Sequence, residues 1–148
     1  MPVDILIIGE ALLDFLPNVR GAMRSVGQYD VHPGGAPANV ALGLARLGVR
    51  PSLISLVGDD EFGQLILNRL KEGGVECSRV TVQPGTRTGL CFVTLDEDAE
   101  RSFTHRGGDP FTHLGPEHVT SDWAANAKIL CFSASPFRVA QSALAIRN

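Results

Sequence analysis

The stretch PSLISLVGDDEFGQLILNRLKEGG, residues 51–74, contains the pattern that decides the fold. Pro51 to Val57 is dominated by leucine, isoleucine and valine, as in a strand that is buried on both faces of a parallel sheet. Gly58-Asp59-Asp60 then predicts a turn. Glu61 to Glu72 predicts a helix that ends at Gly73-Gly74, with apolar side chains along one face at Phe62, Leu65, Ile66 and Leu70.

The residues before this stretch show the same order of elements. Val3 to Ile8 is rich in β-branched residues and leucine and is closed by Gly9, so it predicts a central buried strand. A helix is expected to open within Gly34 to Asn39, with a proline near its first turn and Gly48 as its stop signal. Strand, helix, strand and helix within 74 residues predict right-handed crossovers, and therefore an α/β layered domain built on a parallel sheet.

After residue 75 the alternation of strand and helix patterns gives way to β-rich runs. Thr88 to Leu95 and Glu100 to Arg106 are β-rich runs around an acidic turn, which predicts a hairpin outside the main sheet. Glu10 to Phe15 is expected to leave the first strand and enter an irregular stretch, and Gln28 to His32 to form a short exposed strand. We expect that strand to pair with the hairpin as a small β lid, formed by about 15–33 and 86–108 of a single 1–148 domain.

The last part of the sequence predicts further α/β elements. Pro116 to Ala127 and Phe137 to Asn148 are expected to be helical, and Ile129 to Phe132 to be a core strand. A sheet made only of the strands near residues 3, 52, 80 and 129 leaves one edge open. The pattern therefore predicts an exposed apolar patch or a continuation of the chain beyond Asn148.

Composition excludes several classes of protein. The 148 residues are 44% hydrophobic and 20% charged with a formal net charge of −3, so we expect no nucleic-acid partner. Apolar runs are too short to cross a bilayer, which predicts no membrane association and a soluble, cytoplasmic protein. The odd set of cysteines predicts buried reduced thiols, and the four histidines lack ligand spacing, so we expect no metal site; the cysteines are Cys77, Cys91 and Cys131.

The residues best suited to chemistry surround the predicted helix start. Gly34 and Gly35 precede the helix, so backbone can approach a ligand closely there. Asn39 offers both a hydrogen-bond donor and an acceptor, and Asp14 offers a carboxylate. Sugar hydroxyls need both kinds of partner, so this set suits a sugar. Alternatively, the two glycines serve only to make a tight turn before a packed helix. For Asp14, the alternative is a role in a turn or a helix cap.

The segment resembles the first signature of the ribokinase-like (pfkB-type) carbohydrate kinases. The resemblance extends from Ile7 to about Ile146, and residues 9–17 and 33–43 look most like fructokinases. It implies a kinase that uses ATP and Mg²⁺ to phosphorylate a sugar, and a homodimer that forms through the lid. The matching signature positions are Ala36, Pro37, Asn39, Ala41, Gly48 and Gly58.

The resemblance also implies a set of substrate-binding residues. Asp14 and Asn39 are expected to bond sugar hydroxyls, and Gly34 and Gly35 to line the pocket. The resemblance also suggests Phe103 and Arg106, but less strongly. They fall at positions where the lid strands face the substrate in the family. A packing role for Phe103 and a solvated charge for Arg106 are equally compatible with the sequence. Ribokinases carry an acidic sugar ligand where this chain has Cys131 to Pro136, so the resemblance favours a hexose or a keto-sugar acid over ribose.

The second signature of the family, Asp-Thr-x-Gly-Ala-Gly-Asp, does not occur in this sequence. Its last aspartate is the catalytic base in the family, so no catalytic residue is assigned here. Gly107-Gly108-Asp109 lacks the leading Asp-Thr and predicts only a turn, and no Gly-x-x-x-x-Gly-Lys phosphate loop is present. We expect a truncated half of a fructokinase-like enzyme that is inactive alone. The alternatives are a 2-keto-3-deoxygluconate kinase and a non-catalytic sugar-binding or interaction module.

Overall fold

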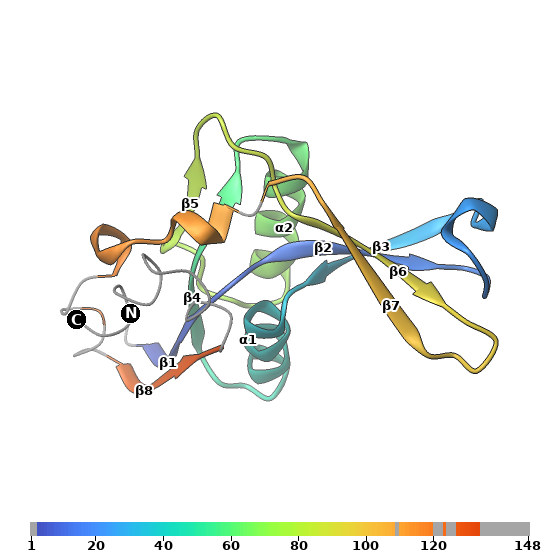
Figure 1. Ribbon diagram of the computed structural model, residues 1–148. Helices are drawn as coiled ribbons and strands as arrows, with labels where there is room; N and C mark the ends of the chain where they lie inside the picture. The colour runs from blue at the N-terminus through green and yellow to red at the C-terminus, as the bar shows by residue number, and fades with distance from the viewer. Residues whose placement is uncertain (1–2, 109, 120–122, 124–126, 134–148) are drawn as a thin grey trace.

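The computed structural model describes residues 3–108, 110–119, 123 and 127–133 and contains two sheets (Figure 1). The first is a fully parallel sheet of four strands in the order β5-β4-β1-β8. Its strands are β1 (Val3–Ile8), β4 (Pro51–Gly58), β5 (Val80–Gln83) and β8 (Ala127–Phe132). The predicted set of core strands and the α/β fold class are confirmed.

Two helices cover one face of this sheet, α1 (Ala36–Arg46) and α2 (Glu61–Glu72). Their buried side chains share a core with alternate residues of the strands, among them Ile7, Leu53 and Val57. Leu6, Ile54 and their neighbours on the other face pack under the segment of 3-10 turns that follows residue 109. The central strand β4 and the second half of β1 are therefore buried on both sides, as their continuous apolar sequences predict.

The second sheet projects from this body and has the order β3-β2-β6-β7 (Figure 1). It contains one parallel pair, β2 with β6, between two antiparallel pairs. We call the end where Leu12 pairs with Gly34 and Leu90 with Arg106 the root, because the strands leave the body there. The strands are β2 (Leu12–Pro17), β3 (Tyr29–Gly34), β6 (Leu90–Leu95) and β7 (Arg101–Arg106).

Two predictions about this sheet are wrong. Residues 12–17 form strand β2, although the sequence suggested an irregular stretch after Gly9. The strand that contains His32 does not pair with the hairpin, because β2 lies between them. Leu12-Leu13 interrupts the alternation that marks a strand in sequence, and β2 gains its partners from two distant segments of the chain.

The predicted helix from Pro116 to Ala127 is also not formed as expected. A short 3-10 helix covers Pro116–His118, and Val119 is extended. Most of the remaining positions, and the predicted helix over 137–148, lie outside the described residues. Pro116 has the backbone angle of a helix start, but Val119 leaves the helical conformation one turn later.

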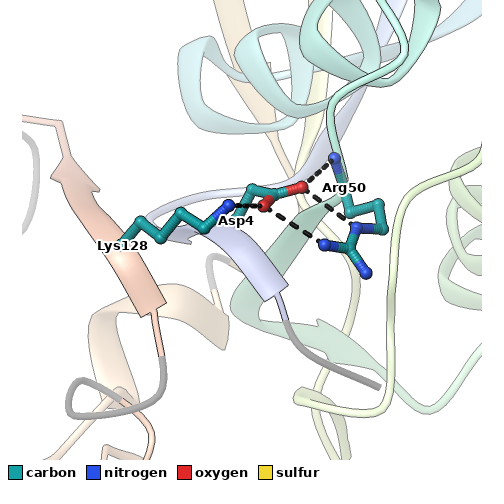
Figure 2. A network of polar contacts seen from close by, with 3 residues as sticks. All are labelled: Asp4, Arg50 and Lys128. Atoms are coloured by element: carbon teal, nitrogen blue, oxygen red, sulfur yellow. Dashed lines mark hydrogen bonds and ion pairs between the residues drawn. The ribbon is translucent and has the colours of Figure 1, made fainter.

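The predicted open edge lies at β8. Ile129 is 56% exposed, and Leu130 and Phe132 are also exposed. An ion-pair network connects this edge to the centre of the sheet at the amino ends of the strands (Figure 2). The Asp4 carboxylate accepts from Arg50 Nε at 3.0 Å and from Lys128 Nζ at 2.8 Å, and these bonds hold the pKa of Asp4 well below its usual value. It links β8, β1 and the residue before β4.

A second network joins the two sheets. Asp60 is the N-cap of α2, and its carboxylate accepts from Gly63 N, Thr88 N and Thr88 Oγ1 at 2.8, 2.9 and 2.6 Å. Thr88 Oγ1 in turn accepts from Gly58 N at the end of β4. Burial raises the pKa of Asp60, but the bonds from Thr88 and Gly63 outweigh burial and keep that pKa low. The network fixes the entry to β6 against the body.

Replacing Thr88 by valine tests this joint. Thr88 is 1% exposed, so Thr88→Val keeps the shape but removes the hydroxyl bond to Asp60 and leaves the Gly58 N–H without its buried acceptor. We expect the free energy of unfolding, measured by urea denaturation, to fall by about 1–3 kcal/mol. Thr81→Val at an exposed position of β5 is the control, and equal stability of the two variants would contradict the role of Thr88.

Candidate functional site

The candidate site lies where the carboxyl ends of β1 and β8, the amino end of α1 and the root of the second sheet meet. Ligands of open α/β sheets bind outside the carboxyl ends of the strands, because the connecting loops gather there. β1 ends at Ile8 and is followed by Gly9 and Glu10, and β8 is followed by Ser133. The backbone N–H of Ser133 donates to Ile8 O at 3.4 Å, so these two ends are neighbours.

The absence of a side chain at Gly34 leaves room for the Asp14 carboxyl group. A Cβ atom on Gly34 would lie 2.4 Å from both Cγ and Oδ2 of Asp14, far inside van der Waals contact. Gly34 is buried at the end of β3, and Asp14 lies on the adjacent strand β2, opposite His32. Any side chain at position 34 would therefore displace the carboxyl group.

Gly35 meets both a conformational and a spatial requirement. Its φ of 90° is in the region that favours glycine, and a Cβ atom there would lie 2.6 Å from the carbonyl oxygen of Glu10. Gly35 is the N-cap of α1, so this contact brings the first turn of the helix against the loop after β1. Asn39 lies one turn into α1 with an exposed side chain, and its backbone N–H donates to Gly35 O at 3.0 Å.

A row of polar residues crosses the second sheet beside this point. Strand pairing aligns His32 with Asp14, Asp14 with Cys91 and Cys91 with His105. Directly paired residues point to the same face of a sheet, so these four side chains share one face. Cys91 Sγ lies 4.0 Å from His105 Nε2, and the thiol also hydrogen-bonds the Asp14 carboxyl.

The environment makes Asp14 a partly dehydrated hydrogen-bond acceptor. Burial raises the pKa of Asp14, and the electrostatic effect of His105, the Cys91 thiol and the electrostatic effects of His32 and Arg101 only partly oppose this rise. Burial and the Asp14 charge likewise raise the pKa of the Cys91 thiol. A carboxylate in such a place gains strongly from donors that a ligand supplies.

The predicted site residues fall into two groups. Phe103 pairs with Val93, two positions from His105 on β7, and so shares the face of Asp14; it is 58% exposed. Arg106 pairs with Leu90, which belongs to the opposite face, and its Nη1 donates to the carbonyl oxygen of His105 at 3.0 Å. The structure thus places Asp14, Gly34 and Gly35 near the root, with Asn39 one turn into α1. Phe103 lies on the face of Asp14 but farther along β7, and Arg106 lies at the root on the opposite face.

Sequence reasoning missed several residues at this site. Cys91 and His105 belong to it only through strand pairing, which the sequence pattern did not reveal. Glu10 was also missed: its Oε2 accepts from Ser133 Oγ at 3.1 Å. The stretch after β8 has no carboxylate of its own, as the sequence indicates, but the loop after β1 supplies one beside it.

Two kinds of feature are absent from the part of the chain that the structure describes. No group of three or more histidine, cysteine or acidic side chains gathers there in a way that could hold a metal ion. None of its helices is long and apolar enough to cross a membrane.

Comparison with known proteins gives a consistent set of relatives. The model of the pfkB family carbohydrate kinases matches residues 3–146. A probable fructokinase from Arabidopsis thaliana is 40% identical over 123 residues, which cover 82% of this chain and 38% of that protein. The chain therefore spans about two fifths of the length of this curated relative.

Solved structures are similar over nearly the whole chain. The fructokinase from Xylella fastidiosa has a TM-score of 0.84 at 30% identity over 97% of this chain and 46% of its own. A putative ribokinase II from E. coli, solved with ATP and Mg²⁺, has a TM-score of 0.87 at 27% identity over 98% of this chain and 47% of its own. These similarities agree with the fold and the resemblance that the sequence indicated.

The raised pKa of Asp14 predicts how its replacement changes stability. A carboxyl with a higher pKa in the folded state favours folding when protonated and loses that contribution as pH rises through the folded pKa. Asp14→Asn should therefore be more stable than wild type at pH 7. This difference in stability should shrink toward zero near pH 3.5, because Asp14 becomes protonated in both the folded and the unfolded protein.

Urea denaturation at several pH values measures this effect. Asp30→Asn, at an exposed position on the neighbouring strand β3, is the matched control and should show no such trend. An Asp14→Asn variant that is less stable than wild type at pH 7, and loses that deficit in acid, would contradict the assigned direction.

Proposed function

Because the chain belongs to the pfkB family of carbohydrate kinases, we propose that its protein transfers phosphate from ATP to a hydroxyl group of a sugar, and that the sugar is fructose. The observation that carries the proposal is the Asp14 carboxyl, held against Gly34 at the root of the second sheet. The similarity to fructokinases from plants and from Xylella fastidiosa supports the choice of sugar.

In this proposal, Asp14 orients the sugar. A carboxylate accepts hydrogen bonds from two hydroxyls without supplying a competing donor. Asn39 at the start of α1 bonds a further hydroxyl, and the exposed ring of Phe103 covers the apolar face of the sugar. The second sheet then acts as a lid, and its closure over the sugar excludes water that would otherwise compete for the phosphate.

We assign ATP, Mg²⁺ and the catalytic base mainly to a part of the protein that this sequence does not include. Phosphoryl transfer needs a cradle for the triphosphate, a cation and a group that takes the hydroxyl proton. The sequence lacks the Asp-Thr-x-Gly-Ala-Gly-Asp signature that supplies them in the family.

The position of Arg106 removes one argument for 2-keto-3-deoxygluconate as the substrate. Arginine binds carboxylates well, and Arg106 is the arginine that the family resemblance suggests for this role. Arg106 faces away from Asp14 and bonds the carbonyl of His105, so the face that holds Asp14 does not present it. A neutral hexose needs no such partner.

An assay of the complete gene product tests the proposal. With ATP, Mg²⁺ and a panel of fructose, ribose and 2-keto-3-deoxygluconate, fructose should give the fastest ADP release. Asp14→Asn should lower kcat/KM for fructose about 100-fold, since each bond to a charged group contributes about 1.5–3 kcal/mol. Asp30→Asn should retain wild-type activity. If no sugar raises ADP release, the protein is a binding or interaction module and the proposal fails.

We also propose that the protein forms a homodimer through the second sheet. Within the described residues β3 and β7 are edge strands, and Leu16 and Val19 expose 37% and 45% of their surface on or beside β2. Strand edges and exposed apolar side chains together favour a partner of the same kind. Light scattering of the complete protein should give a dimer mass that Leu16→Glu reduces to a monomer. A wild-type protein that stays monomeric at high concentration would rule the dimer out.

A further inference from the structure

His105 lies on the same face of the second sheet as Asp14, and we propose that it is the basic lid residue that binds the sugar, in the role that the sequence suggested for Arg106. The inference rests on the proposed function and extends it, because it names a residue that selects the substrate. An imidazole can donate to one hydroxyl and accept from another, which suits a neutral polyol.

The strand register brings His105 to Asp14. Their strands are separated only by β6, so their backbones are about 10 Å apart, two strand spacings. Both side chains contact the thiol of Cys91 between them: His105 Nε2 lies 4.0 Å from Sγ, and Asp14 hydrogen-bonds the same group. Cys91 is 2% exposed, so it forms a floor between the two polar groups.

Exposure and charge are consistent with a ligand contact. His105 is exposed although it touches a buried thiol, so a ligand above Cys91 can reach its ring. His105, His32 and Arg101 are the basic side chains whose electrostatic effect reaches the Asp14 carboxyl. His105 and Arg101 both belong to the face of β7 that carries Phe103.

Arg106 occupies the other face. It pairs with Leu90, and Leu90 pairs with Leu13, which is fully buried in the main core. To reach a sugar on Asp14, the guanidinium would have to pass around the edge strand β7. Its bond to the carbonyl oxygen of His105 places it beside the backbone of that strand instead.

Steady-state kinetics of the complete protein test the proposal. His105→Ala should raise KM for fructose about tenfold and leave kcat within about twofold, because the contact is lost in substrate and transition state alike. Arg106→Ala should have a clearly smaller effect on KM. Ser102→Ala, an exposed position on the opposite face of β7, should match wild type.

A purely structural role for His105 makes a different prediction. It would lower thermal stability and activity together, and His105→Gln would not restore binding. The proposal expects His105→Gln to recover most of the affinity, since a glutamine amide also donates and accepts. A larger KM change in Arg106→Ala than in His105→Ala would overturn it.

A binding measurement keeps this inference separate from the assay of function. In ¹H–¹³C spectra of wild-type protein, fructose should shift the ring signals of His105, identified by their loss in His105→Gln, and leave those of His113 unchanged. If wild type releases no ADP with any sugar, the proposed function fails while these spectra still report on His105. Unchanged His105 signals at saturating fructose would refute the contact.

Discussion

The close approach of Asp14 to Gly34 is the constraint on which the site depends. A carboxyl group occupies the space that any side chain at position 34 would need. This contact lies between β2 and β3, and it places Asp14 between the start of α1 and the row that leads to His105. Because the surrounding strands dehydrate Asp14, the group is held ready to accept bonds before a ligand arrives.

A second constraint holds the two sheets in register with each other. Gly58 is one of the matching signature positions, and its contacts and those of the nearby Gly63 are with other parts of the fold. A Cβ atom on Gly58 would lie 2.3 Å from Thr88 N, and one on Gly63 would lie 2.2 Å from Gly58 O. Because these backbone segments lie so close together, the Asp60 carboxylate reaches the N–H and the hydroxyl of Thr88. Gly58 and Asp60 therefore anchor the second sheet to the body through Thr88.

The body of the fold could be predicted from the sequence, since its signals are local. Continuous apolar runs identified β1 and β4, and one-sided periodicity with a glycine stop identified α2. β2 could not be found in this way. It lacks clear alternation, and its partners β3 and β6 lie on separate segments of the chain.

The error in β2 explains the incomplete prediction of the site. Asp14, Gly34 and Gly35 were identified from residue types that suit a sugar and from a family resemblance, without knowledge of strand pairing. The face on which Phe103, His105 and Arg106 lie depends on the register of β6 with β7, and a shift by one residue would exchange them. Only the structure separates His105 from Arg106.

A crystal structure of the complete protein with fructose and a non-hydrolysable ATP analogue tests the central claim most directly. The claim predicts a sugar hydroxyl oxygen about 2.5–3.0 Å from a carboxylate oxygen of Asp14, with the sugar above Cys91. Fructose bound elsewhere, with Asp14 still bonded only to Cys91, would contradict it.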